Sequence, residues 1–309
     1  LNEMADGSGN SRRSRQLFTD SYAPAEWSFQ TYMRPFIGAT SGSNIWEGSG
    51  RDAHHHAVEE ALWANFVAAP TFTASSGTTE AAWSAGVTNS TSSVVFDFTG
   101  SEKPALGTFD LFFEFAGAQS SGGQSFYRLK DAVVSSASID FDIDGIATIT
   151  WSGFASMITD IASLPSSITT DIREAVDSTG NFIRNRLTQL SVTAADTSTF
   201  PGQSSNGVYD LVLTGGNITM ENNITYLTPE TLGVVNQPLG HVTGTRSVSG
   251  NFTCYLNNAT GGSADLFEDL IEATSVITNS FDVDFLIGGT AAPKVLIELP
   301  KCHFEVPSH

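Results

Sequence analysis

Positively charged residues are scarce in this chain: 14 Lys and Arg oppose 33 Asp and Glu among 309 residues, and the formal net charge is -19. Nucleic-acid binding depends on Lys and Arg, which release the counterions condensed on the phosphate backbone. This charge balance therefore argues against sequence-specific nucleic-acid binding. It disfavours binding to anionic membrane surfaces for the same reason.

Long apolar runs are also missing. No segment approaches the roughly 20 apolar residues that a membrane-spanning helix needs. Residues 1–16 are polar, include three Arg residues and have no apolar core of a secretory signal. We expect no membrane partner, and we expect residues 1–16 to form a flexible N-terminal arm.

Cysteine is nearly absent, because the chain has only Cys254 and Cys302. Two cysteines do not make a disulfide framework. Both lie in strand-like segments, where neighbouring strands can bring two thiols close enough to bridge. We favour two reduced thiols that pack as small apolar side chains, and leave their pairing open.

The residues that are abundant predict a mainly β fold with few short helices. Charged residues are only 15% of the chain, Ser, Thr, Asn and Gly are frequent, and there are 21 Phe. Alternating patterns predict strands, and Asp144-Gly145 is a hairpin turn signal. The predicted strands are 28–34, 93–98, 108–115, 125–129, 132–143, 147–151, 187–193, 208–213, 218–226, 246–256, 281–287 and 294–306.

Three segments have helical patterns: 53–67, part of 157–176, and 264–273. Ser263 is the predicted N-cap of the last helix, since Ser is a preferred capping residue. The acidic residues that follow it suit the positive end of a helix dipole.

A strand–loop–helix unit occurs twice. Phe29-x-x-Tyr32 is followed by a loop and an acidic helix over 57–63, and Phe252-x-x-Tyr255 by a shorter loop and a similar helix over 266–272. A repeated supersecondary unit indicates architecture before chemistry. We predict an arm over 1–16, a first β domain over 17–155, a connecting segment over 156–184 and a second β domain over 185–309.

Motifs for chemistry are weak. His54, His55 and His56 precede Glu59 and Glu60, but the HExxH order and a third ligand are lacking, so a solvated helix start is the better interpretation. Residues 140–145 match the opening of a calcium loop, yet the twelfth position is Trp rather than Glu. An alternating strand explains them, although a weakly held cation between chains stays open at this acidic face.

No catalytic, cofactor or metal residue is assigned. The sequence has no phosphate-binding glycine loop, no nucleophile elbow and no Cys-x-x-Cys motif. Two other function classes remain as alternatives at this point. They are a carbohydrate-binding β-sandwich or adhesin, and an acidic glycosidase for which no carboxylate pair stands out.

Several strings resemble bacteriophage tail tube proteins. They are residues 21–36 followed by 56–63, residues 136–154, residues 222–233 and residues 244–256. The resemblance implies two tandem tube-like β-sandwich or barrel domains, each flanked by a helix. It also implies a non-enzymatic virion protein that is assembled in the host cytoplasm and forms stacked rings around a DNA conduit.

The same resemblance implies the partners. They are other copies of the chain, in trimeric pseudo-hexameric or hexameric rings, together with terminator, distal tail and tape measure proteins; DNA passes without specific binding. Polar glycine-rich loops that order on assembly are the expected ring contacts: Ser41, Gly42, Ser43, Asn44, Gly48, Ser49, Ser120, Ser121, Gly122 and Gly123. The expected acidic lumen residues are Asp140, Asp142, Asp144, Asp282 and Asp284.

Overall fold

The computed structural model describes residues 21–39, 51–57, 59–68, 72–73, 82–83, 87–88, 91–92, 106–116, 124–165, 182–273, 280–290 and 294–305. Antiparallel strands make up most of this part of the chain, and the helices are few and short. The prediction of a mainly β fold is therefore confirmed.

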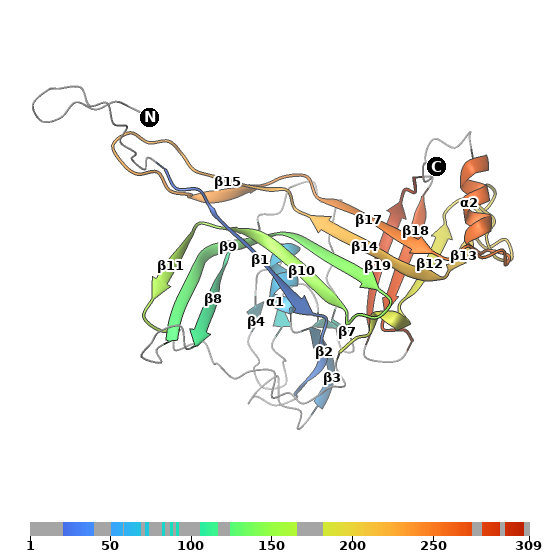
Figure 1. Ribbon diagram of the computed structural model, residues 1–309, viewed down its shortest axis with the longest axis horizontal. Coiled ribbons are helices and arrows are strands. Elements are labelled where there is room, and N and C mark those ends of the chain that lie inside the picture. Colours follow the sequence, from blue (N-terminus) through green and yellow to red (C-terminus); the bar gives the residue numbers. More distant parts are fainter. Residues whose placement is uncertain are drawn as a thin grey trace, which may run out of the picture.

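A seven-stranded sheet, here called the main sheet, forms the long axis of the molecule (Figure 1). Its strand order is β1-β10-β9-β14-β17, and β8 and β11 pair with the remaining part of β9. The strands are β1 (Ala25–Tyr32), β8 (Phe109–Ala116), β9 (Gln124–Asp142), β10 (Thr148–Ala155), β11 (Met157–Ile161), β14 (Leu213–Glu221) and β17 (Ser247–Cys254). Strands from both predicted domains thus share one sheet, because β9 pairs directly with β14.

Strand β9 is bent, and the bend divides the main sheet. Its first part, up to Ala132, pairs with β8 and β11, and the part from Val133 onward pairs with β10 and β14. Asp131 lies next to this change of partners with φ 52°, a value that non-glycine residues rarely adopt. Two strands were predicted here, over 125–129 and 132–143, and the structure joins them into one.

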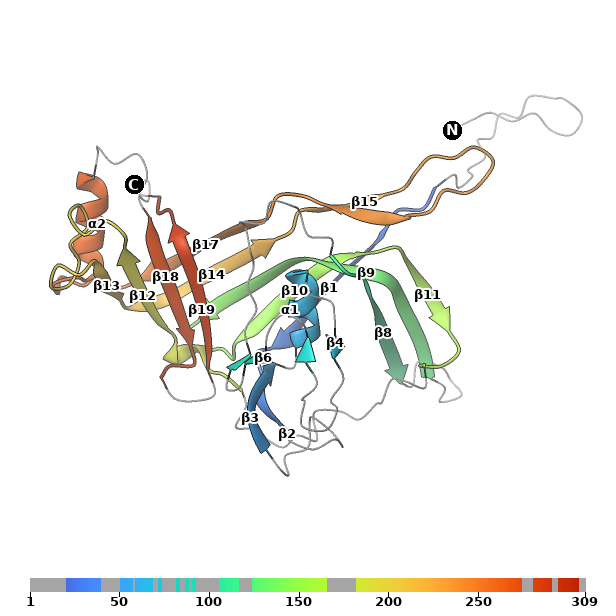
Figure 2. The same cartoon turned by 180° about the vertical axis from the view of Figure 1, so that it is seen from behind.

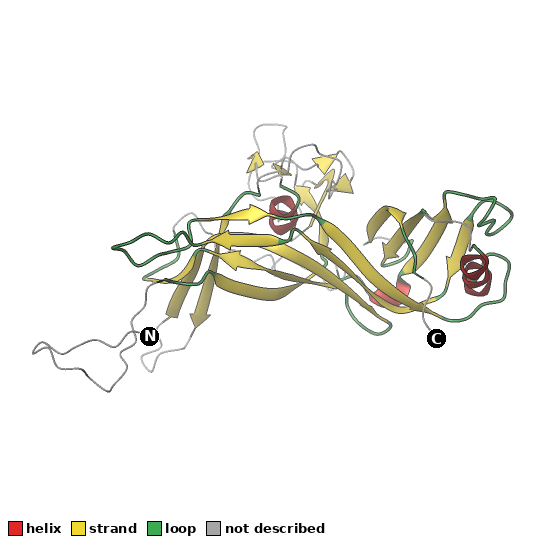
Figure 3. Ribbon diagram, turned by 90° about the horizontal axis from the view of Figure 1, so that it is seen from above, coloured by secondary structure: helices red, strands yellow, loops and turns green. Residues whose placement is uncertain are grey.

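A four-stranded sheet packs against one end of the main sheet (Figure 3). Its order is β13 (Val208–Leu211), β12 (Gln189–Ala194), β18 (Phe281–Ile287) and β19 (Val295–Cys302). The rings of Phe141 and Phe285 stack between the two sheets, with their centroids 5.2 Å apart. The buried faces of the two sheets therefore point toward one another, and their outer faces point in opposite directions.

Within the described residues, two α-helices flank the sheets. Helix α1 (Glu60–Phe66) covers the buried face of the main sheet (Figure 2). There Trp63 meets Trp151 edge to face, with 4.9 Å between the ring centroids. Helix α2 (Ser263–Glu272) lies beside β13. Each helix follows an edge strand of the main sheet along the chain, since α1 comes after β1 and α2 comes after β17.

The remaining elements in the described part of the chain are short hairpins and one turn of 3-10 helix. A hairpin of β15 (Ile224–Leu227) and β16 (Gly240–Thr243) extends from β14 and β17 well beyond the main sheet (Figure 1). The others are β2 (Pro35–Ala39) with β3 (Arg51–Ala57), β4 (Phe72–Thr73) with β5 (Ala82–Trp83), β6 (Val87–Thr88) with β7 (Thr91–Ser92), and η2 (Asn185–Leu187).

Two local predictions were wrong. The predicted helix over 53–67 begins only at Glu60, because residues 51–57 are strand β3 and pair with β2. The N-cap of α2 is Gly262 rather than Ser263, whose hydroxyl instead donates to the carbonyl of Tyr255 at 2.7 Å. Part of 157–176 was predicted to be helical; residues 157–161 are strand β11 and pair with β9, and residues 166–176 lie outside the described residues. The predicted strand over 93–98 lies outside the described residues.

Candidate assembly surfaces

The outer side of the main sheet has a continuous face of small polar side chains, here called the polar face. The register aligns them in rows, for example Gln30, Thr150, Ser138, Thr219 and Ser249 on five neighbouring strands. None of the members is buried. The polar face consists of Ser28, Gln30, Ser136, Ser138, Asp140, Thr148, Thr150, Ser152, Asn217, Thr219, Glu221, Ser247, Ser249 and Asn251.

Hydrogen bonds connect the polar face across the strands. The hydroxyl oxygens of Ser136 and Ser152 are 2.7 Å apart, and Gln30 Nε2 donates to Thr150 Oγ1 at 3.1 Å. Asn217 Nδ2 donates to Ser138 Oγ at 2.9 Å and to Asp140 Oδ1 at 2.5 Å. Side chains of neighbouring strands are therefore bonded to one another on this polar surface.

The charge of the polar face has one sign. Its charged members are Asp140 and Glu221, and no Lys or Arg belongs to it. Asp142 is exposed at the end of the same strand, and Asp144 follows in the exposed turn, 3.7 Å from Arg186. Three of the predicted lumen residues thus lie on or beside this face.

The other two predicted lumen residues lie elsewhere. Asp282 and Asp284 are on β18 of the four-stranded sheet, beside Thr193 and Ser191 of β12. They belong to its outer face, which points away from the polar face because the buried faces of the two sheets pack together. One surface cannot include both sets of acids.

The ten predicted ring-contact residues lie outside the described residues. They fall in two segments, residues 40–50 between β2 and β3, and residues 117–123 between β8 and β9. Their role as contacts stays a prediction.

The two lateral edges of the main sheet are open. Within the described residues, β1 pairs only with β10, and β17 pairs only with β14. An open strand edge presents backbone N–H and C=O groups in register, and another chain can pair with them. The two Phe-x-x-Tyr strands of the repeat are these two edges.

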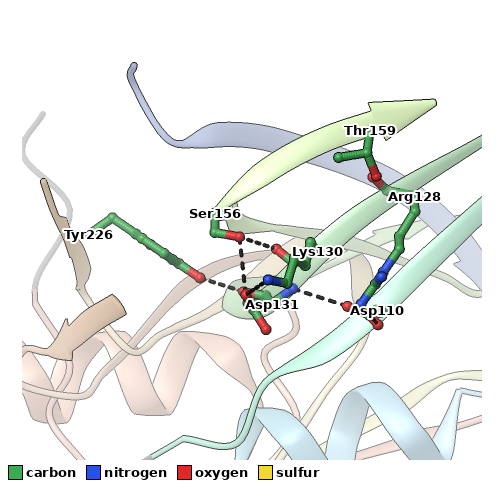
Figure 4. A network of polar contacts seen from close by, with 7 residues as sticks. All are labelled: Asp110, Arg128, Lys130, Asp131, Ser156, Thr159 and Tyr226. Atoms are coloured by element: carbon green, nitrogen blue, oxygen red, sulfur yellow. Dashed lines mark hydrogen bonds and ion pairs between the residues drawn. The ribbon is translucent and has the colours of Figure 1, made fainter. Parts of the chain in front are cut away.

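A network of polar contacts fixes the bend of β9 (Figure 4). Arg128 Nη2 and Asp110 Oδ2 are 2.5 Å apart, and Asp110 Oδ1 accepts the backbone N–H of Asp131 at 3.1 Å. The hydroxyl of Ser156 donates to the carbonyl of Lys130 at 2.9 Å. Tyr226 Oη, at the base of the β15–β16 hairpin, donates to the carbonyl of Asp131.

No metal or redox centre is assembled by the described residues. They contain no group of three or more His, Cys, Asp and Glu side chains that could hold a metal ion. His54, His55 and His56 belong to strand β3 rather than to a helix. Both cysteines are free, and burial raises the pKa of the Cys254 and Cys302 thiols. No helix within the described residues is long and apolar enough to cross a membrane.

Comparison with known proteins decides the family. The family model described as phage tail tube protein matches residues 52–306. The chain belongs to the phage tail tube protein family. It is also 27% identical over 308 aligned residues to tail tube protein pb6 of Escherichia phage T5, which covers 96% of this chain and 58% of that protein. The chain therefore spans less than two thirds of the length of this relative.

Membership of the tail tube family gives the chain a structural role in the phage tail. The resemblance noted in the sequence is confirmed. The polar face was not predicted as a unit, although its signal was present in the sequence. Residues 136–140, 148–152, 217–221 and 247–251 each alternate small polar with apolar or glycine residues. What the pattern did not contain was the pairing that joins these segments side by side.

Proposed function

We propose that this tail tube protein forms rings that stack into the tube wall, and that the polar face of its main sheet lines the DNA conduit. The observation behind the proposal is the composition of this face, which has Ser, Thr, Asn, Gln, Asp and Glu but no Lys or Arg. A wall that conducts DNA must not hold the phosphate backbone. A surface without cations has no group that releases counterions from it.

Acidic residues on the wall add repulsion at short range. Charges are screened over about 10 Å at 0.1 M salt, so Asp140 and Asp142 act only on DNA that comes close to the wall. In this arrangement the lumen lies near Asp140, Asp142 and Asp144. The outer wall would instead include Asp282 and Asp284, because the outer face of the four-stranded sheet points away from the polar face.

In this proposal, the open edge strands of the main sheet join neighbouring subunits and close the ring. Strand β17 of one subunit would pair with β1 of its neighbour, so that the main sheets join into one barrel. Each chain has two strand–loop–helix units, which fits trimeric rings with pseudo-sixfold symmetry. Hexameric rings with the second unit as decoration remain the alternative. The ten loop residues named above as expected ring contacts, which lie outside the described residues, keep that role in this proposal.

The same proposal includes the further partners. Terminator and distal tail proteins would cap the two ends of the tube, a tape measure protein would occupy the lumen before DNA does, and assembly would take place in the host cytoplasm. The role is non-catalytic and needs no cofactor. It replaces the carbohydrate-binding and glycosidase alternatives, since tail tube family membership supports neither.

A labelling experiment tests which face lines the lumen. Ser138→Cys on the polar face and Ser191→Cys on the outer face of the four-stranded sheet are a matched pair, each made with Cys254→Ser and Cys302→Ser. A maleimide on a polymer too large to enter the tube should label both variants before assembly. In tubes it should label only Ser191→Cys. Equal labelling of both variants in tubes would contradict the proposal.

A further inference from the structure

Two elements extend from the main sheet beside the bend of β9. One is a three-stranded flap, here called the flap and defined as β8, β11 and the part of β9 up to Ala132 (Figure 2). The other is the β15–β16 hairpin with its tip, here called the projecting arm and defined as residues 222–246 (Figure 1). Within the described residues, no strand of the flap pairs with a strand of the arm. Contacts between these two elements therefore come from side chains and single backbone groups.

Three residues at which the chain enters or leaves the flap are here called the hinge residues. Leu106 lies shortly before β8, Asp131 lies at the bend of β9, and Ser156 is the single residue between β10 and β11. Asp131 has φ 52°, in the left-handed region, where Asp is among the few non-glycine residues found. Backbone rotation at these residues would change the angle between the flap and the main sheet.

Hydrogen bonds connect two hinge residues to each other and to the flap. Ser156 Oγ lies 2.9 Å from the carbonyl oxygen of Lys130 and 3.2 Å from Asp131 Oδ2 (Figure 4). On the other side of the bend, Asp110 Oδ1 of β8 accepts the backbone N–H of Asp131 at 3.1 Å. These bonds lie within the flap and its hinge, so they set the local geometry of the bend.

The base of the projecting arm bonds two of the hinge residues. Tyr226 of β15 and His241 of β16 are cross-strand partners, and their ring centroids are 5.8 Å apart. The hydroxyl of Tyr226 donates to the carbonyl of Asp131 (Figure 4). The side chain of His241 forms a hydrogen bond with the backbone of Leu106. One residue pair of the arm thus holds the chain where it leads into β8 and where β9 bends.

A small apolar cluster, separate from the main core, lies at the same place. Its buried members are Leu106, Val133 and Ile224, and Phe154 and Tyr226 pack against it. Two of the buried members flank the hinge, whereas Ile224 belongs to the arm. The ring centroids of Phe154 and Tyr226 are 6.4 Å apart. The base of the arm therefore buries apolar surface against the hinge of the flap.

We propose that Tyr226 and His241 hold the hinge of the flap, so that the flap and the projecting arm change position together. Rotation of the flap alone would separate Tyr226 from the carbonyl of Asp131 and would open the apolar cluster. Both losses cost free energy, so joint movement is favoured. The coupling is reciprocal: a contact that favours one position of the arm favours the matching position of the flap. This inference goes beyond the proposed function and does not depend on it, since the coupling exists in the unassembled chain.

Tyr226→Phe tests the contact, because it removes the hydroxyl and retains the ring that packs against Phe154. Amide hydrogen exchange of the unassembled chain should become about threefold to tenfold faster in β8 and β11 and stay unchanged in β10 and β14. The matched control is Tyr209→Phe, which also loses a phenolic hydrogen bond but lies in the four-stranded sheet. It should leave exchange in the flap unchanged.

His241→Phe tests the other half of the pair. It removes the bond to Leu106 and retains a ring beside Tyr226. Exchange should become faster in β8 more than in β11, because Leu106 leads directly into β8. Parent-like exchange in the flap for both Tyr226→Phe and His241→Phe would overturn the inference. So would faster exchange spread evenly over the main sheet, since that result indicates general destabilisation.

A distance measurement tests the joint movement itself. Nitroxide labels are attached to Ile158→Cys on the flap and Leu239→Cys on the arm, both exposed positions, in a chain that also has Cys254→Ser and Cys302→Ser. Double electron–electron resonance on the unassembled chain should give one narrow distance distribution. The distribution should broaden when Tyr226→Phe is added. A broad distribution without Tyr226→Phe, or a width that this substitution does not change, would show that the two elements move independently.

Discussion

Helices α1 and α2 follow equivalent edge strands, yet they are held in different ways. Helix α1 packs by aromatic rings, since Trp63 and Phe66 both meet the fully buried Trp151 edge to face. Helix α2 buries Leu266, and Asp269 accepts a hydrogen bond from the hydroxyl of Tyr209 at 2.5 Å. Aromatic rings thus dominate the packing of α1, whereas α2 combines the burial of Leu266 with a hydrogen bond from Tyr209.

This difference predicts unequal sensitivity to mutation. Removing a large buried ring costs the transfer free energy and leaves a cavity, whereas removing one hydrogen bond costs much less. Truncating a contact of α1 in the first half should therefore lower the free energy of unfolding more than truncating the equivalent contact of α2 in the second half. Four predictions test this expectation, from the largest effect to the smallest.

Trp151→Ala should lower the free energy of unfolding by about 3–5 kcal/mol, because the ring lies between β10 and helix α1. Its Nε1 also donates to Thr31 Oγ1 at 2.8 Å, and that bond would be lost. Denaturant unfolding of the unassembled chain measures the change. Trp151→Phe, which retains a ring, is the control and should cost clearly less. A loss below about 1 kcal/mol for the alanine variant would remove the contrast between the halves.

Gly153→Ala should destabilise the same region by about 1–3 kcal/mol through overpacking. A Cβ atom at this position would lie 2.0 Å from the carbonyl oxygen of Val133 and 2.5 Å from the ring of Trp27. Gly240→Ala, in the projecting arm, is the control because a Cβ there meets nothing within 4 Å. Equal melting temperatures for the two variants would show that the β1–β10 contact yields more easily than the structure indicates.

Tyr209→Phe should cost about 1–2 kcal/mol, because it removes one hydrogen bond to a carboxylate in the second half. Burial, the hydrogen bond to Asp269 and the charge of that carboxylate raise the pKa of Tyr209 above its ordinary value. A raised pKa in the folded state means that this stability is present below about pH 10 and is lost as the pH rises beyond it. Unfolding measured from pH 8 upward should show a smaller decline for Tyr209→Phe than for the parent chain.

Asp196→Asn should have the smallest effect. Hydrogen bonds from the side chains of Ser198 and Thr199 lower the pKa of Asp196 from 3.8 to about 2. A lowered pKa in the folded state means that this contribution is present above about pH 4 and is lost as the pH falls toward 2. The difference in melting temperature between parent and variant should shrink over that window. A difference that stays constant would show that these hydrogen bonds do not stabilise the turn.

Local patterns in the sequence predicted much of the strand content. The strand over 281–287 has the predicted bounds, and the turn at Asp144 joins β9 to β10 as its Asp-Gly signal indicates. In β9 the alternation assigns Ile139 and Phe141 to the core and leaves Asp140 and Asp142 exposed. These features depend on residues that are close together in the sequence, so local patterns are enough to predict them.

Features that depend on distant pairing were not visible. Residues 53–57 fit a helical pattern, but pairing with β2 makes them a strand. Asp140 and Asp282 lie in similar alternating segments, and only the packing of Phe141 on Phe285 shows that they belong to opposite faces. The predicted strand over 218–226 is interrupted at Asn223, where φ is 49°, and the chain beyond it enters the arm.

The sharing of the main sheet between both halves of the chain has a mechanical consequence. Strand β9 pairs with β14 over the residues from Gly215 to Glu221, so the halves are joined by backbone hydrogen bonds rather than by the connecting segment alone. In a wall where subunits also join through β1 and β17, lateral tension would pass from strand to strand around the circumference. Under load, such a wall should part between chains before it parts within one.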